Sequence, residues 1–329
     1  MQKPFFSIII PAYNLENYIA AALQSVLVQT FQDFEIIIVD DGSSDETVSI
    51  IQSFHDPRIR LVSQVNGGVS RARNAGMKKA VGAYIAFLDG DDYWYPEHLE
   101  LAADFFNRHP EILAYANRYM RDELEAIPPR PPSYPESIRR LGIRGVLFMH
   151  SSSVILNSSL ASRLPPWEEA MPYGEDGLYW TRCMRGTGLI GLGGSVTSIY
   201  RQRASSAMHD EHYQHVSLHS LIAPLLNELE AMKNPKWQFA VHYLVIRELH
   251  PKRLLSLNAE ERISLTGRIR KIMHPCLNRP FLDSYMKACS ARAGMEQSFS
   301  ALMDRTMFSC KWLDRLERMG RSLFFRLQT

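Results

Sequence analysis

Residues 34–54, FEIIIVDDGSSDETVSIIQSF, contain the repeating unit that decides the fold of this chain. An apolar run ends at Asp40, a polar cluster follows it, and an amphipathic run begins at about Asp45. A strand with almost no polar positions is typical of a sheet that helices cover on both faces. The stretch therefore predicts a buried strand, a polar loop and a helix, in that order.

The same alternation fills the first hundred residues and indicates an α/β protein with a mostly parallel sheet. Apolar runs predict strands at 5–10, 34–40, 59–63 and 83–89, and amphipathic runs predict helices at about 16–29, 45–54 and 69–81. Repeated strand–helix units imply right-handed crossovers between parallel strands. Ligands bind at the carboxyl ends of strands in such sheets, and polar clusters follow three of the strands, at 11–14, 40–45 and 89–92.

The pattern changes after a predicted helix at about 96–108 and a strand at about 112–118. Residues 127–135, IPPRPPSYP, contain five prolines and predict a loop. Further on, the sequence predicts one or two strands within 143–157, a helix from near Glu175, a strand at 196–200 and helices from about 208 onward. We therefore expect an α/β domain over 1–205 and a helical region over 206–329.

The composition is that of an ordinary globular protein. Its 329 residues suffice for one large domain and a smaller appendage, and 46% are hydrophobic and 22% charged. A net charge of +2 argues against nucleic-acid binding by the whole chain. No apolar run approaches the ~18–20 residues of a membrane span, and the N-terminal run is too short for a signal peptide. Four widely spaced cysteines form neither a zinc pattern nor a disulfide framework, so we expect a reduced, cytoplasmic protein.

The tetrad Asp89-Gly90-Asp91-Asp92 directly follows a predicted strand. Three carboxylates within four residues repel one another unless a cation or water neutralises them. Hard divalent ions such as Mn²⁺ or Mg²⁺ prefer oxygen ligands and leave room for substrate phosphates. Gly90 allows the backbone to turn and to approach a ligand closely. A solvated acidic turn is the alternative, but the position at a strand's carboxyl end favours a metal site.

The cluster DDGSSD (40–45) and the segment NGGVSRARNAG (66–76) are the other candidate binding elements. One serine or aspartate would suffice to cap the next helix, but the first cluster carries three carboxylates. One of them could accept a hydrogen bond from a base or a ribose, as acidic residues do in other nucleotide-binding α/β folds. In the second segment, a helix N-terminus with Arg71 and Arg73 favours phosphate, although exposed arginines on helices are common.

Four segments stand in the order and at the spacing of one known family: PAYN (11–14), VDDGSSDET (39–47), NGGVSRARNAG (66–76) and FLDGDD (87–92). Together they resemble the family 2 glycosyltransferases of GT-A fold, and the resemblance covers about residues 5–205. It implies a Rossmann-like mixed, mostly parallel sheet flanked by helices. It also implies inverting transfer of a sugar from a nucleotide-sugar donor to an acceptor hydroxyl, with Mn²⁺ or Mg²⁺ as cofactor.

The resemblance assigns the nucleoside pocket to the first two segments. Pro11, Ala12 and Tyr13 would line that pocket. Asp41 would hold the base, and Asp40 would lie beside it. These roles follow from the matching positions in the family's motifs.

The other two segments would bind the diphosphate and the metal. Arg73 would lie near the donor, and Gly90 would lie in the loop that contacts it. Asp89 and Asp91 would form the DxD-like pair of metal-binding residues. Asp91 would be the direct ligand through which the metal reaches the diphosphate.

Two later segments extend the resemblance. WEE (167–169) followed by YGED (173–176) resembles the family's "ED" segment, which would make Asp176 the general base. An acidic pair at a helix start can also simply complement the helix dipole, and Glu175 fits that role. YRQR (200–203) resembles a loop that closes over the donor, so Arg201 and Arg203 could pair with the diphosphate.

Two features depart from the family's pattern, and two others lie outside it. The chain has no Gln-x-x-Arg-Trp motif, which disfavours a processive synthase, and HSSS (150–153) matches no pattern at the start of the acceptor side. The histidines at 209, 212, 215 and 219 favour a solvated or packed helix face over a metal site. The basic, apolar run 311–327 favours packing or a homodimer contact over peripheral contact with the inner face of the membrane.

The expected protein is a metal-dependent glycosyltransferase of the hexosyltransferase class. The catalytic domain would span 1–205, with a donor half of about 1–118 and an acceptor half of about 119–205. A UDP-sugar is the expected donor on family frequency, and a glycan or lipid-linked glycan in bacterial surface polysaccharide synthesis is the expected acceptor. Two alternatives stay open. One is a catalytically inactive GT-A protein that binds or scaffolds, and the other is a different nucleotide-using α/β enzyme, which the absence of a glycine-rich loop after the first strand disfavours.

Overall fold

The computed structural model describes residues 3–122, 135–139, 149–201, 218–231, 241, 244–245, 249, 257–272 and 301. Most of the proline-rich loop, Arg203, the side chains of the histidine cluster and the C-terminal basic run lie outside these residues. The chain divides into two compact units. The first contains 1–141, 148–169 and 182–206, and the second contains 142–147, 170–181 and 207–329.

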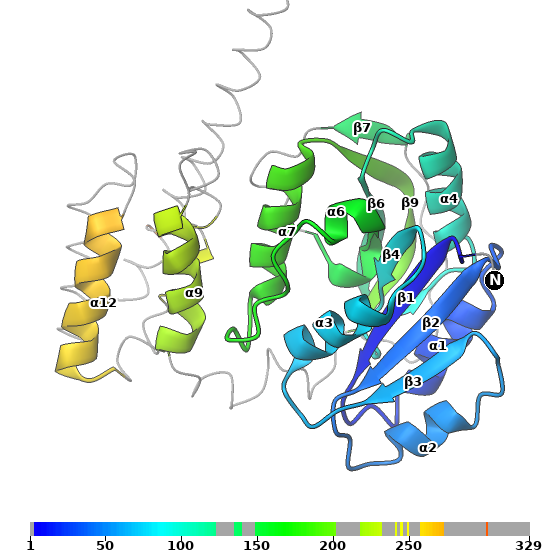
Figure 1. Cartoon of the computed structure of the whole chain (residues 1–329), viewed down its shortest axis with the longest axis horizontal. Coiled ribbons are helices and arrows are strands. Elements are labelled where there is room, and N and C mark those ends of the chain that lie inside the picture. The colour runs from blue at the N-terminus through cyan, green and yellow to red at the C-terminus, as the bar shows by residue number, and fades with distance from the viewer. Residues whose placement is uncertain are drawn as a thin grey trace, which may run out of the picture. The chain divides into compact units, whose positions relative to one another are not determined.

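The first unit is built on one mixed sheet. In the described residues its strands run in the order β3-β2-β1-β4-β8-β6-β9-β5, with β7 beside β9 (Figure 1). The strands are β1 (Phe6–Ala12), β2 (Phe34–Asp40), β3 (Ile59–Ser63), β4 (Tyr84–Phe87), β5 (Tyr93–Trp94), β6 (Ala114–Asp122), β7 (Ser137–Arg139), β8 (Val154–Asn157) and β9 (Ile190–Arg201). Strands β1, β2, β3, β4, β6 and β9 share one direction, so the predicted α/β class with a mostly parallel sheet is confirmed.

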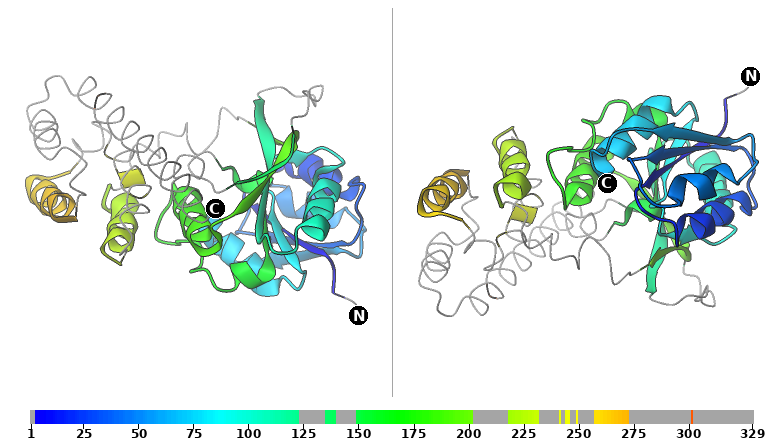
Figure 2. Two further views of the ribbon diagram at one scale, coloured as in Figure 1. Left: turned by 90° about the horizontal axis from the view of Figure 1, so that it is seen from above. Right: turned by 90° about the horizontal axis from the view of Figure 1, so that it is seen from below.

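Helices lie on both faces of this sheet (Figures 1 and 2). Alternate residues of β1 and β2 point to opposite faces and are mostly apolar on each, so both faces must be covered. Helices α1 (Ile19–Leu27), α2 (Thr47–Gln52) and α4 (His98–Arg108) pack on the face that carries Ile8, Ile10, Ile36 and Ile38. Helix α3 (Val69–Lys79) packs on the opposite face, against Ile37 and Val39.

Gly76 determines how closely α3 approaches the sheet. A Cβ atom at this position would lie 2.5 Å from Ile9 Cγ2 and 3.4 Å from Val39 Cγ2. The helix can lie this close only because the residue has no side chain. Arg73, one turn earlier on the same helix, is thereby held beside the loop that follows β4.

The remaining elements follow β7 in the chain. A 3₁₀ turn, η1 (Ser151–Ser153), leads into β8, and α6 (Ser158–Ala161) follows that strand. Helix α7 (Glu175–Thr187) begins at the predicted residue. In the second unit, α9 (Leu218–Ala231) and α12 (Ala259–Ile272) pack against each other. None of the helices in the described ranges combines the length and apolarity that crossing a bilayer requires.

Candidate active site

The carboxyl ends of β1, β2 and β4 meet at one edge of the sheet. Strand β1 lies between the other two, with Ala12 opposite Asp40 and Ile9 opposite Phe87. Beyond the strands, Asp41 N donates to Ala12 O at 2.8 Å. The three polar clusters at 11–14, 40–45 and 89–92 are therefore neighbours in space, although they are far apart in the sequence.

Asp41 fastens the loop before α3 to the end of β2. Its Oδ1 accepts hydrogen bonds from Gln64 Nε2 at 2.7 Å and Gly67 N at 2.9 Å, and its Oδ2 accepts one from Gly68 N at 2.7 Å. Gly68 has φ +86°, a conformation that favours glycine. The amides of Gly67 and Gly68, which precede the helix N-terminus that the sequence suggested for phosphate, thus bind the carboxylate of Asp41. Three of its roughly four acceptor positions are occupied, which leaves one for a ligand.

The residues assigned to the nucleoside pocket lie at the adjoining ends of β1 and β2. Asp40 Oδ1 accepts from Ser43 N at 3.0 Å, and its side chain is only 4% exposed. Pro11 and Ala12 are buried at the end of β1. Tyr13 is 49% exposed, so its ring offers an open aromatic surface next to the acidic strand ends. An exposed ring beside buried hydrogen-bond acceptors is a suitable setting for a base.

Arg73 and Asp89 form an ion pair at this edge. Arg73 Nη2 donates to Asp89 Oδ1 at 2.7 Å, and the arginine side chain is only 4% exposed. The guanidinium carbon lies 4.5 Å over the centroid of the Trp167 ring, a cation–π arrangement. The pair fixes the guanidinium of Arg73 beside the acidic loop, and a guanidinium is a group that can bind phosphate.

Asp92 is the fully buried member of the acidic tetrad. Its Oδ2 accepts from Ser152 Oγ at 2.5 Å, and its Oδ1 accepts from Arg201 N at 3.0 Å. Burial raises the pKa of Asp92 well above its usual value, and the charges of Asp91 and Asp89 raise it further. Asp92 therefore links the loop after β4 to η1 and to the end of β9.

The serines of HSSS (150–153), for which the sequence offered no pattern, belong to this network. Ser152 Oγ also accepts from Asp89 N at 3.1 Å, and His150 Nδ1 lies 3.6 Å from Asp92 Oδ2. Ligand atoms of Asp89, Asp92 and His150 all lie within 4.8 Å of one another. Carboxylates and an imidazole suit Mn²⁺, and the carboxylates alone suit Mg²⁺, so the donor atoms fit the expected cofactor. Asp91, in the same loop, is half-buried.

Two other residues of this region have structural contacts of their own. A Cβ atom on Gly90 would lie 2.7 Å from Leu15 Cδ1 and 3.0 Å from Pro11 O, so the close approach at Gly90 is to the protein's own core. The guanidinium of Arg201 lies 5.3 Å over the Tyr18 ring and 5.2 Å over the Tyr93 ring. Arg201 is thus held next to Asp92 by its backbone and between two aromatic rings by its side chain.

Asp176 lies in the second unit, in the first turn of α7. Its neighbour Glu175 is buried, whereas Asp176 is half-buried. Gly174, immediately before the helix, has φ +75°, a conformation that favours glycine. Asp176 therefore lies at a helix start, as the sequence predicted.

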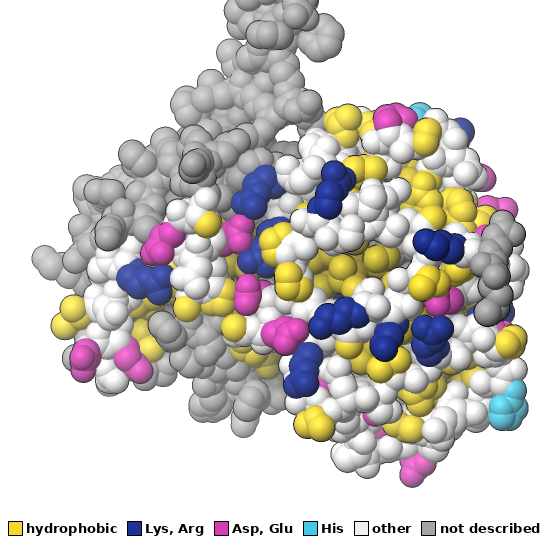
Figure 3. Space-filling view, in the orientation of Figure 1, with side chains coloured by type: hydrophobic (Ala, Val, Ile, Leu, Met, Phe, Trp, Pro, Cys, Tyr) yellow, Lys and Arg dark blue, Asp and Glu magenta, His cyan; other side chains and the backbone are white. Residues whose placement is uncertain are grey.

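Lys and Arg side chains gather over and beside α3 on the face of the first unit shown in Figure 3. The exposed basic residues of that helix are Arg71, Lys78 and Lys79. The two lysines stand in the last turn, where a positive charge complements the helix dipole. This arrangement explains the lysines without a ligand.

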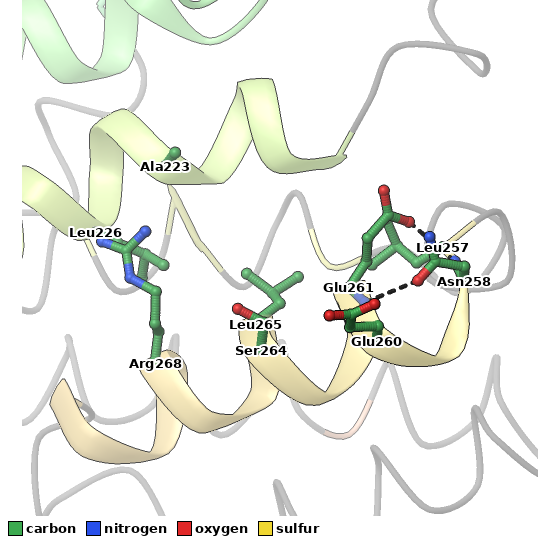
Figure 4. A pocket seen from close by; sticks show the side chains of 9 residues that line it. All are labelled: Ala223, Leu226, Leu257, Asn258, Glu260, Glu261, Ser264, Leu265 and Arg268. Atoms are coloured by element: carbon green, nitrogen blue, oxygen red, sulfur yellow. Dashed lines mark hydrogen bonds between the residues drawn. The ribbon is translucent and has the colours of Figure 1, made fainter.

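A hollow of about 390 Å³ lies between α9 and α12 in the second unit (Figure 4). Arg268 Nη2 donates to Asn227 Oδ1 at 3.1 Å, and Asn258 and Glu261 exchange two backbone-to-side-chain hydrogen bonds at 2.9 Å. That exchange is a capping box at the start of α12. The polar groups that line the hollow thus stabilise the helix pair, and we assign no ligand to it.

Comparisons with known proteins show the family of this chain. Residues 7–161 match the family described as Glycosyl transferase family 2. Over 212 residues the chain is 32% identical to an Escherichia coli protein, UDP-Glc:alpha-D-GlcNAc-diphosphoundecaprenol beta-1,3-glucosyltransferase WfgD. This match covers 63% of the chain and 80% of the E. coli protein. The chain therefore belongs to glycosyl transferase family 2.

Another relative is more similar over a shorter segment. An uncharacterized glycosyltransferase, EpsJ of Bacillus subtilis (strain 168), is 50% identical over 92 residues, and the match spans 27% of each protein. Among solved structures, S. aureus TarS 1–349 in complex with UDP-GlcNAc has a TM-score of 0.64 at 20% identity. That likeness covers 94% of this chain and 92% of TarS 1–349. The chain has the GT-A fold that the resemblance predicted.

Proposed function

We propose that the protein transfers a sugar from a nucleotide-sugar donor to an acceptor hydroxyl, with inversion at the anomeric carbon. The observation that carries this proposal is the meeting of the acidic strand ends beside the Arg73–Asp89 ion pair. Carboxylates can accept from a base and a ribose and can hold a cation, and a guanidinium can pair with phosphate. A nucleoside diphosphate carries all of these groups in one ligand.

We infer that the nucleotide is UDP. TarS was solved with UDP-GlcNAc, and the E. coli relative is named for UDP-Glc. In this chain, Pro11, Ala12 and Tyr13 would line the nucleoside pocket. Asp41 would use its remaining acceptor position for the base, and Asp40 would lie beside it.

A divalent cation, Mn²⁺ or Mg²⁺, would be held by the acidic loop after β4. We assign direct contact to Asp91, with Asp89 beside it, because these two residues match the DxD-like pair of the family. Such an ion, when bound, acts as a Lewis acid that offsets the charge of the leaving diphosphate. Arg73 and Arg201 would add positive charge near the same group, and Gly90 would keep the loop packed against Leu15.

Asp176 would act as the general base. It would take the proton from the acceptor hydroxyl while that oxygen attacks the anomeric carbon. The bond from this carbon to the diphosphate oxygen breaks, through a transition state that resembles an oxocarbenium ion. The proton ends on Asp176, and the nucleoside diphosphate leaves with the bonding electron pair.

The acceptor would be a glycan or a lipid-linked glycan of a bacterial surface polysaccharide. Support comes from the E. coli relative, whose name gives a GlcNAc-diphosphoundecaprenol acceptor. With such an acceptor the enzyme would work at the inner face of the membrane, as a cytoplasmic or peripheral protein. The helices of 206–329 would supply any membrane or homodimer contact.

Asp176→Asn tests the assignment of the base. General-base help contributes about 10²–10⁴-fold, so the variant should lose transfer by about that factor. UDP affinity should not change, because Asp176 is assigned no contact with the nucleotide. The assay would measure UDP release from UDP-glucose with a GlcNAc-diphospho-lipid acceptor and Mn²⁺, and calorimetry would measure UDP binding.

Glu260→Gln is a matched control for this experiment. Glu260 also stands in the first turn of a helix, α12, and is exposed. Its substitution removes a similar helix-dipole interaction, so transfer should stay at the wild-type rate. Equal losses of transfer and UDP affinity in Asp176→Asn would contradict the role of a base.

A further inference from the structure

Asn74 joins α3 to segment 167–169 through three hydrogen bonds. Its Nδ2 donates to Trp167 O and to Glu169 Oε1, both at 2.9 Å. Its Oδ1 accepts from Trp167 N, also at 2.9 Å. The side chain is only 5% exposed. The amide therefore pairs with both backbone groups of Trp167, as a neighbouring strand would.

Only a primary amide suits this environment. The nitrogen faces a carbonyl and a carboxylate, which are both acceptors, and the oxygen faces an N–H donor. An aspartate at position 74 could still accept from Trp167 N. It could not donate, so its charge would face the oxygens of Trp167 and Glu169. Leaving buried polar groups without partners is costly, so the identity of this residue matters.

The ring of Trp167 connects this amide to the ion pair of the candidate site. One side of the ring faces Arg73, whose Cζ lies 4.5 Å from the ring centroid. The ring also meets Phe87, the last residue of β4, edge to face at a centroid distance of 5.4 Å. Arg73 in turn donates to Asp89 at 2.7 Å. The guanidinium is thus fixed from its face by Trp167 and at its tip by Asp89.

We propose that Asn74 is a positioning residue, which holds Trp167 over Arg73 and so keeps the guanidinium aligned with Asp89. The consequence for donor binding rests on the proposed function. Without Asn74, segment 167–169 would lose its tie to α3, and the Trp167 ring would no longer confine the arginine. Misplacement by about 1 Å in such a site can cost about 10²-fold in rate.

The direct test follows the guanidinium itself by NMR. The side-chain Nε–Hε signal of Arg73, assigned by its loss in Arg73→Gln, should be shifted by the ring current of Trp167. Asn74→Asp should move this signal towards the position of an arginine far from any ring. Trp167→Phe, which keeps both backbone hydrogen bonds to Asn74, should move it as well. If Asn74→Asp does not fold, Asn74→Ser replaces it, because serine removes the repulsive charge.

A second measurement separates positioning from general stability. Calorimetry with UDP and Mn²⁺ should show at least tenfold weaker binding in Asn74→Asp than in wild type. In an Arg73→Gln background, the same change should weaken binding by less than about twofold. If the two residues acted independently, Asn74→Asp would weaken UDP binding by the same factor in both backgrounds, within about twofold. The same loss of UDP affinity in the Arg73→Gln background would therefore overturn the proposal.

Asn117→Asp is the matched control. Asn117 is likewise 5% exposed and accepts from Tyr115 Oη at 2.9 Å, on strand β6. Its substitution should lower the melting temperature but leave the Arg73 signal and UDP affinity unchanged. An unmoved Arg73 signal in Asn74→Asp would overturn the proposal whatever the nucleotide result. If the wild-type protein bound no UDP, the inferred donor nucleotide would be contradicted instead. The Nε–Hε signal of Arg73 would still decide the role of Asn74.

Discussion

Asp41 illustrates what a single residue's sequence context can and cannot predict. The strand–loop–helix pattern places its carboxylate at a ligand-binding edge of the sheet, and the structure puts it there. Its three hydrogen-bond donors come from residues 23 to 27 positions further along the chain. Such partners depend on how β2 and β3 pair, which no local motif encodes. The sequence therefore predicted the acidic group and missed its partners.

Asp92 is a second acidic residue whose hydrogen-bond partners the sequence did not predict. The sequence identified the tetrad, but the partners of Asp92 come from η1 and the end of β9. The run HSSS (150–153) carried the only local signal, a polar cluster between apolar residues. A buried carboxylate needs hydrogen-bond donors, so small hydroxyl residues near a predicted acidic loop are reasonable candidates for that task.

His98 carries a prediction at the residue scale. It is fully buried, its Nδ1 lies 2.9 Å from Thr197 Oγ1, and its ring stacks on Trp94 at 4.1 Å. Burial lowers the pKa of His98 from 6.5 to about 3. Below pH 6.5 the unfolded chain binds a proton that the folded protein does not. Stability should therefore fall as pH falls from about 6.5 to about 3, by up to about 1.4 kcal/mol per pH unit for this residue.

His98→Gln isolates that contribution. Glutamine keeps a hydrogen-bonding side chain but cannot take up the proton, so the variant's stability should fall less steeply over this pH range. Urea denaturation at several pH values would measure how the free energy of unfolding changes with pH in wild type and in the variant. The other histidines contribute equally in both proteins. Identical slopes for the two proteins would show that His98 does not titrate as its burial requires.

At the scale of elements, the apolar strands β1, β2 and β4 were predictable because each is almost entirely buried, whereas the edge strand β3 is only partly buried. Strand β9 was predicted at 196–200 but begins at Ile190. Its early part contains glycines, which normally argue against a strand. A Cβ on Gly191 would lie 2.1 Å from Phe105 Cζ, and one on Gly193 would lie 2.5 Å from Tyr115 Oη. These glycines make room for aromatic rings that pack on the strand, a reason that only the fold reveals.

The close packing of α3 on β1 gives a prediction at this scale. Gly76→Ala should destabilise the protein by about 1–3 kcal/mol, because the new methyl group would overlap the Ile9 side chain. The variant should also weaken UDP binding, since α3 carries Arg73. Thermal and urea denaturation would measure the stability.

Gly267→Ala provides the matched comparison. Gly267 lies within α12, and no atom of the described residues lies within 4 Å of the position its Cβ would take. Alanine there should stabilise the protein by about 0.5–1 kcal/mol, because glycine costs that much inside a helix. If both substitutions were stabilising, α3 would not be in contact with β1 as described.

At the scale of the whole molecule, the predicted GT-A fold and family are confirmed. Four ordered motifs sufficed for this, because they mark strand ends that the fold brings to one edge. The division into units was less accessible from sequence. Residues 170–181, which include Asp176, belong to the second unit, although the segments before and after them in the sequence belong to the first. The predicted boundary at 205 divides the chain only once, whereas the two units alternate along the sequence.

The central claim is that the acidic edge of the sheet binds a nucleoside diphosphate together with a metal ion. Calorimetric titration of UDP, GDP and dTDP, with Mn²⁺ and again with EDTA, tests it most directly. The account predicts that UDP binds in Mn²⁺, and that EDTA or Asp91→Asn abolishes most of this binding. Failure of all three nucleotides to bind a folded sample would contradict the claim, and the chain would then be better explained as a catalytically inactive GT-A protein.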